Sequence, residues 1–384
     1  MNKRFGTYVV QKNSIESFKA FVPQSLPPDP AVDVQRLLPV LDLATRALAE
    51  LNSVVHAIPN MSLFLYMYVR KEALLSSQIE GTQSSLADLM LFEADQKSDI
   101  AFEDVEEVSN YVKATQHGLE RMKNGFPLSL RLLREIHAIL LSGSRGSGKL
   151  PGEFRRSQNW IGGSRPGNAR FVPPPPAEML DCLSDFEKFL HTDTFPVLIK
   201  AGLAHVQFET IHPFLDGNGR LGRLLITLLL CADGVITAPV LYLSFYLKEH
   251  RREYYDLLQD VRLKGDWEGW LEFFLEGVAV SARQGLETVK DVNELFERDR
   301  KAIEKLGRVR FSVIKVFEFL QKLPQVSVSV LGDQLQLTPP TLRVAIEHLK
   351  KLGILHEITG KKRDQVYVYR QYLGLLSVGT EPLR

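Results

Sequence analysis

The stretch Ile211-His-Pro-Phe-Leu-Asp-Gly-Asn-Gly-Arg-Leu-Gly-Arg223 decides how the rest of this sequence is interpreted. His212 ends an apolar helical segment, where an imidazole with a pKa of about 6.5 can accept a proton. Asp216 follows in a loop, and a lone carboxylate beside a phosphate site suits Mg²⁺. The Gly217-Asn218-Gly219 turn frees backbone N–H groups at the start of a helix, which is a good place to bind an anion.

Two arginines complete this pattern. Arg220 and Arg223 are three residues apart, so both project to one side of the first helical turn. Two guanidiniums beside an anion-binding turn predict a polyphosphate ligand. The alternative is a glycine-rich helix start with two solvated arginines and a capping histidine. That alternative does not explain why base, carboxylate, turn and arginines all fall between residues 212 and 223.

The composition is that of an ordinary globular protein. The 384 residues suggest two or three domains, and 45% hydrophobic and 24% charged residues exclude disordered, collagen-like and mucin-like classes. The net charge of +1 does not indicate a polybasic nucleic-acid binder or an acidic tail. Two cysteines, Cys182 and Cys231, are too few for a disulfide framework or a zinc site, which favours a reducing compartment.

The sequence shows no targeting or membrane-spanning segment. The first residues, MNKRFGTYVVQKNS, lack an apolar signal core. The longest largely apolar run, residues 224–232, is far shorter than the roughly 20 residues that a membrane span needs. We therefore expect a soluble, cytoplasmic protein without a membrane partner.

Helical periodicity dominates most of the chain, so we expect a mostly α fold. Residues 1–30 end in a proline-rich stretch and are expected to form an extended arm. The expected helices that follow cover residues 37–51, 62–80, 103–122, 129–141, 177–191, 197–211, 218–232 and 266–306. Residues 154–172 break the pattern, because GGSRPGN separates two short apolar pieces. This predicts a β-hairpin.

The last part of the chain has a different organisation. Helices are expected at 311–322, 328–337 and 338–351, with Thr338 as N-cap, followed by strands at 354–358 and 365–369. Three helices and a hairpin in this order predict a winged helix-turn-helix domain. Residues 309–384 carry a net charge of +5, whereas residues 1–308 carry −4.

The stretch at 211–223 resembles the signature of the Fic family, H-x-F-x-[D/E]-G-N-G-R-x-x-R, at every defined position. The resemblance covers about residues 60–275. It implies a helical Fic core with a β-hairpin flap, and an enzyme that transfers AMP from ATP, with Mg²⁺, to a Ser, Thr or Tyr hydroxyl of target proteins and of itself. The hairpin at 160–171 resembles the flap that holds the target segment by strand pairing.

The resemblance also implies individual roles. His212 would deprotonate the target hydroxyl, Asp216 would hold Mg²⁺, Phe214 would anchor the loop, and Arg223 would reach the γ-phosphate. The implied catalytic residues are His212, Asp216, Asn218 and Arg220. The implied ATP-binding residues are Glu80, Trp160, Ile161, Gly162, Gly163, Gly217, Asn218, Gly219, Arg220, Leu221, Gly222, Arg223, Tyr254 and Tyr255. Tyr254 and Tyr255 are adjacent in a helix, so both cannot face one pocket.

A second segment, Ser76-Ser-Gln-Ile-Glu80-Gly81, ends a helix with a carboxylate in its last turn. That position is unfavourable for the helix dipole, so Glu80 needs a cationic partner unless it is simply solvated. The segment resembles the inhibitory motif of the family, [S/T]-x-x-x-E-[G/N]. The resemblance implies that Ser76, Glu80 and Gly81 form an intramolecular inhibitory helix end in which Glu80 pairs with Arg223.

These observations predict five regions. They are an N-terminal arm and helix (1–60), an inhibitory helix region (61–100), a Fic catalytic core (101–275), a helical connector (276–308) and the winged helix (309–384). His205, seven residues before His212, is expected to be structural and not a metal ligand.

The function prediction is a self-inhibited protein adenylyltransferase. Alternatives are a Fic enzyme that uses another nucleotide or removes AMP, and a DNA-binding regulator that acts through the winged helix. Protein contact or homodimerisation through that domain also stays open. DNA contacts would fall to Arg343, Lys350, Lys351, Lys361, Lys362 and Arg363.

Overall fold

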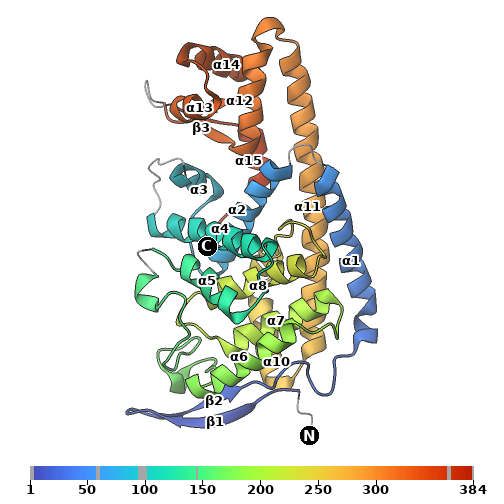
Figure 1. Ribbon diagram of the computed structural model, residues 1–384, viewed down its shortest axis with the longest axis vertical. Helices are drawn as coiled ribbons and strands as arrows, with labels where there is room; N and C mark the ends of the chain where they lie inside the picture. Colours follow the sequence, from blue (N-terminus) through green and yellow to red (C-terminus); the bar gives the residue numbers. More distant parts are fainter. Residues whose placement is uncertain (1–3, 58–60, 94–101, 144–145, 361–364, 383–384) are drawn as a thin grey trace.

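The structure is a computed structural model that describes residues 4–57, 61–93, 102–143, 146–360 and 365–382. The fold is mostly helical, as predicted, with two small antiparallel sheets (Figure 1). The helices up to the centre of the chain are α1 (Val34–Ala57), α2 (Met61–Ile79), α3 (Leu86–Glu93), α4 (Phe102–Lys123), α5 (Leu130–Leu140), α6 (Pro176–Leu190) and α7 (Val197–Ile211). The later helices are α8 (Asn218–Ala232), α9 (Ser244–Glu249), α10 (Arg251–Lys264), α11 (Trp267–Glu304), α12 (Arg310–Lys322), α13 (Val328–Leu335), α14 (Pro339–Lys351) and α15 (Arg370–Ser377).

Helix α7 lies at the centre of the core. Every residue from Leu198 to Ile211 is buried, and a helix that is buried on all sides must be surrounded by other elements. Helices α6, α8, α10 and α11 pack against it, while α4 and α5 pack on α8. The connection between α7 and α8, which carries the Fic-like signature, is therefore held on rigid helices.

Helix α11 joins the helices around α7 to the C-terminal part of the molecule. Its 38 residues make a rod about 57 Å long, and α1 packs along it (Figure 1). Asp266 caps its N-terminus by accepting a hydrogen bond from the Gly269 N–H. The boundary expected between residues 275 and 276 falls inside this continuous helix, so the structure shows no break there.

The C-terminal part contains α12, α13, α14 and a three-stranded sheet. Its strands β3 (Gln325–Ser327), β5 (Val366–Val368) and β4 (His356–Glu357) lie in the order β3-β5-β4, all antiparallel. The three expected helices are present, and Thr338 caps α14 as predicted. Strand β3 and helix α15 were not expected. The helices and strands follow the order of a winged helix-turn-helix, an assignment that stays a prediction.

The N-terminal residues form a hairpin and not the extended arm that the prolines suggested. Strands β1 (Thr7–Lys12) and β2 (Ser17–Val22) pair antiparallel with Thr7 opposite Val22. The turn between them is closed by the Asn13 side chain, which accepts hydrogen bonds from the N–H groups of Ile15 and Glu16. The expectation of an arm rested on prolines that begin only at Pro23. Because β2 has already ended at Val22, these prolines do not prevent residues 7–22 from pairing as two strands.

The predicted flap hairpin is reduced to a single bridge between Ile161 and Phe171. A short 3₁₀ turn, Pro166–Asn168, replaces regular strand at its tip. Glu16 of the N-terminal hairpin holds this tip, because its carboxylate accepts from Arg165 at 2.6 Å and from the Gly167 N–H at 3.0 Å. The N-terminal hairpin therefore supports the flap.

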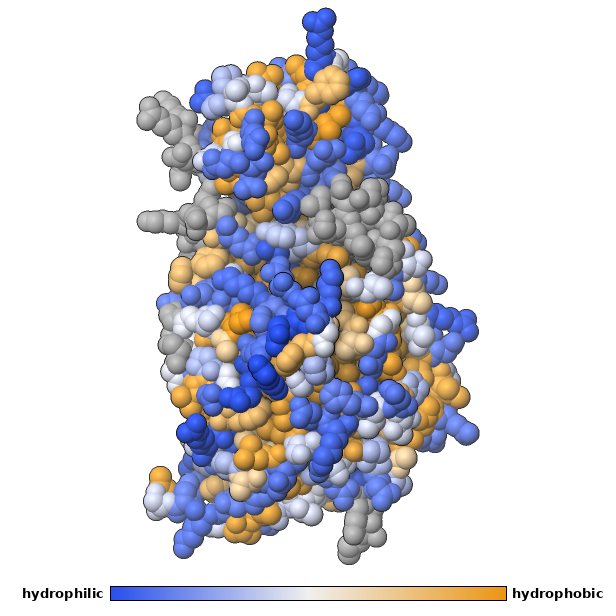
Figure 2. Space-filling model, in the orientation of Figure 1, coloured by the Kyte–Doolittle hydropathy of each residue, from blue (hydrophilic) through white to orange (hydrophobic). Residues whose placement is uncertain are grey.

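Hydrophilic and apolar side chains are mixed over the face shown in Figure 2. Among the described helices, none combines the length and the apolar character required to cross a membrane.

Candidate active site

The backbone of His212 adopts a left-handed conformation where α7 ends. Its φ of 48° is unusual for a residue with a side chain and costs roughly 1–2 kcal/mol. The surrounding structure fixes it. The His212 N–H donates to the Phe208 carbonyl, and Arg155 Nε donates to the His212 carbonyl, both at 2.9 Å. Arg155 is almost fully buried and was not found from the sequence.

Phe214 anchors the loop after His212, as the resemblance implied. Its ring is fully buried and stacks on His137 of α5, with 3.7 Å between the ring centroids. The Asn218 side chain bonds both the N–H and the carbonyl of Phe214, each at 2.9 Å. Both polar atoms of this amide are thus used to close the loop, which makes Asn218 a residue that shapes the site.

His137 fixes the loop from the other side. Its Nδ1 accepts from the Gly152 N–H at 2.9 Å, and its Nε2 donates to the Asp216 carbonyl at 3.0 Å. Burial lowers the pKa of His137 to about 4, so the ring is neutral at pH 7. The sequence showed only a histidine in an amphipathic helix, and nothing in it pointed to the partners that lie 15 and 79 residues away.

The start of α8 is the segment that the sequence predicts to bind an anion. Gly217 has a φ of 74° and precedes the helix, and Asn218 begins it. A Cβ atom placed on Gly219 would lie 2.2 Å from Oε1 of Glu80. The Glu80 carboxylate therefore rests on the backbone at the positive end of α8, where a phosphate group would be stabilised.

Arg223 is bound to the end of α2. Its Nε donates to Ser76 Oγ at 2.9 Å, and its Nη2 donates to the Ser76 carbonyl at 3.0 Å and to Glu80 Oε1 at 2.6 Å. The side chain is 1% exposed, and Nη1 has no hydrogen-bond partner in the described part of the chain. The expected pair between Glu80 and Arg223 is confirmed.

The Glu80–Arg223 pair stabilises both charges. Burial by itself would raise the pKa of Glu80, but the guanidiniums of Arg223 and Arg220 hold it below its usual value. Burial would lower the pKa of Arg223, but Glu80 raises it above its usual value. The Glu80 side chain remains 37% exposed and faces an open cavity. Gly81, with a φ of 108°, ends the α2 turn directly after it.

A cavity of about 420 Å³ lies between α2, the flap, α7, α8 and α10. It brings together a subset of the predicted site residues, namely Glu80, Ile161, Gly162, His212, Gly219, Arg223 and Tyr255. It also contains residues that the sequence did not single out, namely Arg170, Phe171, Glu209, Arg251, Leu258, Gln259 and Arg262. The lining of this cavity therefore overlaps the predicted site only in part, and the nucleotide contacts themselves stay a prediction.

Eight of the fourteen predicted ATP-binding residues do not line this cavity, namely Trp160, Gly163, Gly217, Asn218, Arg220, Leu221, Gly222 and Tyr254. Tyr254 is fully buried and bonds His205 Nε2 at 2.9 Å, while Tyr255 lies beside the cavity. His205 also bonds the Gly222 carbonyl at 2.9 Å, so both of its ring nitrogens have hydrogen-bond partners inside the fold. Leu221 packs in the core because it points to the opposite side of α8 from the cavity. The flap residues Trp160 and Gly163 also lie outside the cavity.

The cavity is lined by four arginines, two glutamates and His212, namely Arg170, Arg223, Arg251, Arg262, Glu80, Glu209 and His212. Arg262 donates to Thr210 Oγ1 and to the Glu209 carbonyl, and its guanidinium lies 4.0 Å from the centre of the Phe171 ring. Burial, with help from the charges of Arg262 and Arg155, lowers the pKa of His212 to about 3. Burial raises the pKa of Glu209 to about 7. His212 is therefore unprotonated at neutral pH and free to accept a proton.

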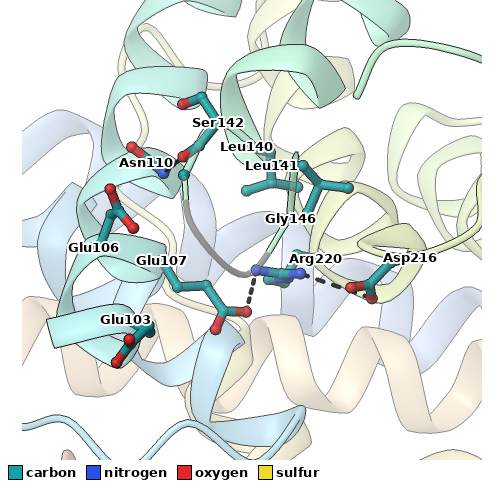
Figure 3. A pocket seen from close by; sticks show the side chains of 11 residues that line it. Glu103, Glu106, Glu107, Asn110, Leu140, Leu141, Ser142, Gly146, Asp216 and Arg220 are labelled. Carbon is teal, nitrogen blue, oxygen red and sulfur yellow. Dashed lines mark hydrogen bonds and ion pairs between the residues drawn. The ribbon is translucent and has the colours of Figure 1, made fainter. Parts of the chain in front are cut away.

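Asp216 and Arg220 face a separate small hollow beside α4 (Figure 3). The Arg220 guanidinium lies between Glu107 of α4, with which it forms a close ion pair, and Asp216, whose Oδ1 is 3.9 Å from Nη2. Arg220 is buried, whereas Asp216 is about half exposed. Glu107, which also accepts a hydrogen bond from Thr82 at 3.4 Å, was not found from the sequence.

Comparison with known families agrees with this geometry. The profile of the Fic/DOC family matches residues 127–230, and the profile described as Fic/DOC family N-terminal matches residues 38–120. The chain therefore contains a Fic N-terminal domain and a Fic domain. The two matched regions include the signature at 211–223 and the α2 segment with Glu80.

Relatives named protein adenylyltransferase Fic are similar to part of this chain. The Aedes aegypti protein is 36% identical over 157 residues, which are 40% of this chain and 28% of the relative. The Culex quinquefasciatus protein is 37% identical over 158 residues, which are again 40% of this chain and 28% of the relative. The Drosophila melanogaster protein is 30% identical over 181 residues, which are 44% of this chain and 34% of the relative. The matched part of the chain thus spans about a third or less of the length of these relatives.

Solved structures share the fold over a larger part of the chain. A Fic family protein from Desulfovibrio desulfuricans has a TM-score of 0.55 at 19% identity, and the match covers 86% of this chain and 96% of that one. A Fic domain protein from Bacteroides thetaiotaomicron has a TM-score of 0.52 at 17% identity, covering 65% and 97%.

The predicted DNA-contact residues are placed only in part. Arg343 and Lys351 are exposed on α14, and Lys350 forms an ion pair with Glu347 at 2.8 Å. Lys361, Lys362 and Arg363 lie outside the described residues.

Proposed function

We propose that this chain is a self-inhibited protein adenylyltransferase that transfers AMP from ATP to a hydroxyl of a protein. The observation that carries the proposal is the position of Glu80. Its carboxylate accepts a hydrogen bond from Arg223 and lies against the backbone of Gly219 at the start of α8. His212 lines the same cavity. A site that holds a carboxylate at a cationic helix start, facing an unprotonated base, is suited to a nucleoside triphosphate and a hydroxyl nucleophile.

The proposed reaction is a direct displacement at the α-phosphorus. The hydroxyl oxygen of the target forms a bond to Pα, the bond from Pα to the bridging oxygen breaks, and pyrophosphate leaves. His212 takes the hydroxyl proton. Its low pKa keeps it unprotonated in the empty site, and the negative charge of a bound triphosphate raises that pKa toward neutrality, which makes it a better base.

The phosphates would be held by the backbone at the start of α8 and by Arg220 and Arg223. Asp216 fits the metal-binding role, because its carboxylate is half exposed beside that helix start. The described residues contain no group of three acidic, histidine or cysteine side chains that could hold a metal alone. Mg²⁺ commonly binds through one carboxylate together with substrate phosphates, and here it would neutralise phosphate charge next to Asp216.

Self-inhibition follows from competition for Arg223. A γ-phosphate and the Glu80 carboxylate would both accept hydrogen bonds from this guanidinium. In the resting structure, Nε and Nη2 already donate to Ser76 and Glu80. A triphosphate that enters beside Glu80 cannot place its γ-phosphate there, so its α-phosphate is not aligned for attack.

Mass spectrometry of the intact chain after incubation with ATP and Mg²⁺ tests the proposal. The Glu80→Gly variant is expected to gain AMP on itself, whereas Glu80→Gly combined with His212→Ala is not. Parallel incubations with UTP, GTP and CTP show which nucleotide is used. A chain that removes AMP would instead release it from a previously modified sample.

A further inference from the structure

Residues 378–381, near the end of the chain, lie against the last turn of α2. The side-chain Nε2 of Gln78 donates to the Thr380 carbonyl at 2.8 Å and to the Ser84 carbonyl at 2.9 Å. Gln78 is fully buried, and Thr380 is 4% exposed. Gln78 precedes Glu80 by two residues, so the turn that carries Glu80 is in direct contact with the C-terminal tail, by which we mean residues 378–381.

Lys248 of α9 joins the tail to this turn a second time. Its Nζ donates to Gln78 Oε1 at 2.7 Å, to the Gly379 carbonyl at 3.1 Å and to the Glu381 carbonyl. Lys248 is 7% exposed. A buried ammonium must satisfy its three donors, and here one goes to the inhibitory helix and two go to the tail.

Charge also attracts the tail to α2. Lys71 of α2 is 1% exposed, and its Nζ lies 4.6 Å from the centre of the Tyr242 ring without a hydrogen bond to any described residue. Burial lowers the pKa of Lys71 to about 8, and the nearby Glu381 carboxylate opposes this shift. Loss of the tail would therefore remove the Glu381 carboxylate, which stabilises the charged form of this buried ammonium.

The path of the tail depends on one glycine. Gly379 has a φ of 75°, a conformation that residues with a side chain rarely adopt. A Cβ atom placed on it would lie 1.9 Å from the Phe245 ring. Any side chain at this position must therefore push the tail and the Phe245 ring apart.

The tail continues directly from the C-terminal part of the molecule. Helix α15 precedes it and packs on α11, where the rings of Tyr372 and Phe296 are 4.8 Å apart. Helix α12 packs against α2 as well. The position of the tail is thus set by the C-terminal part, outside the Fic region at 127–230.

We propose that the C-terminal tail braces the inhibitory turn of α2 and thereby couples the C-terminal part of the molecule to the contact between Glu80 and Arg223. The inference rests on the proposed function and names how the same site is regulated. The turn is closed by the N–H groups of Glu80 and Thr82, which donate to the Ser77 carbonyl, and by that of Gly81, which donates to the Gln78 carbonyl. With Gln78 fixed by the tail and by Lys248, this turn stays formed and Glu80 stays on Arg223.

The test compares two alanine substitutions in the full chain. Gly379→Ala pushes the tail and the Phe245 ring apart, whereas Gly374→Ala in α15 places its Cβ in open space and serves as the matched control. We expect backbone hydrogen exchange at Glu80, Gly81 and Thr82 to become about tenfold faster in Gly379→Ala, since a few buried hydrogen bonds are lost, and to stay unchanged in Gly374→Ala. Lys248→Met is a second way to release the tail without altering its backbone.

Enzyme rates then show whether the brace acts through Glu80. AMP transfer should rise about tenfold in Gly379→Ala, and the same substitution should add nothing to Glu80→Gly. Unchanged exchange at residues 80–82 in a variant whose tail itself exchanges faster would overturn the brace. An equal gain in the Glu80→Gly background would also overturn it. If no variant transfers AMP at all, the proposed function fails, while the exchange data still decide whether the tail holds the turn.

Discussion

Replacing Glu80 with glycine should activate the enzyme, because it frees Arg223. The bond from Arg223 Nη2 to Glu80 is charge-assisted and 2.6 Å long. A buried bond of this kind contributes about 1.5–3 kcal/mol, but Glu80 is 37% exposed, so about 1–2 kcal/mol is reasonable here. If this free energy no longer opposes ATP alignment, the rate of AMP transfer rises by roughly 5–30-fold. An arginine regained by the transferring phosphates can contribute up to about 10²–10³-fold, so the total gain should fall between about 10- and 1000-fold.

The same substitution should make the protein slightly less stable. Arg223 is 1% exposed and would lose its anionic partner. A loss of about 1–2 kcal/mol corresponds to a Tm that is lower by about 1–3 °C for a chain of this length. An activated variant that melts a little earlier is therefore the expected combination.

The assay is the initial rate of AMP incorporation for wild type, Glu80→Gly, Glu80→Gln and Glu80→Gly with Arg223→Ala. Glu80→Gln keeps the shape of the side chain and removes its charge, so its rate should lie between those of wild type and Glu80→Gly. Arg223→Ala should cancel the gain, since the effect runs through that guanidinium. A rate for Glu80→Gly that is equal to or below that of wild type would refute the reasoning and leave residues 76–81 as an ordinary helix end.

Three further results are expected. His212→Ala should lower transfer by about 10²–10⁴-fold while calorimetry shows ATP affinity little changed; similar rates would rule out His212 as the base. In the Glu80→Gly background, Glu107→Gln should raise the KM for ATP about tenfold through misplacement of Arg220 and should add nothing to Arg220→Ala; an effect that persists there would make Glu107 purely structural. His205 is fully buried with a pKa of about 3, below its unfolded value of about 6.5, so it disfavours the native state as pH falls. The stability advantage of wild type over His205→Gln, from urea unfolding, should therefore shrink by about 1 kcal/mol between pH 6 and 5, and a constant difference would contradict the buried neutral imidazole.

The helices around the site could be predicted because their signals are local. The apolar run and the flanking residues gave Val197–Ile211 and Asn218–Ala232 with the bounds that the structure shows. The glycine turn and the spacing of the two arginines predicted an anion site at the start of α8. The Fic resemblance supplied the pair between Glu80 and Arg223, whose partners are 143 residues apart and could not follow from periodicity.

Contacts that depend on tertiary packing escaped the sequence. Tyr254 and Tyr255 are equivalent by propensity, and only the position of His205, 49 residues earlier, makes Tyr254 the buried one. Arg155 reaches the His212 carbonyl from a loop that has no motif of its own. The contact between Gln78 and Thr380 joins residues 302 positions apart through a backbone carbonyl, which no side-chain pattern reveals.

The position of a label from ATP tests the central claim most directly. Glu80→Gly should be incubated with Mg²⁺ and either ATP labelled at the α-phosphate or ATP labelled at the γ-phosphate, and the protein then separated from free nucleotide. The account predicts label on the protein only from the α-phosphate, and none from either position when His212→Ala is added. Label from the γ-phosphate, or no label from the α-phosphate under conditions where the variant binds ATP, would contradict it.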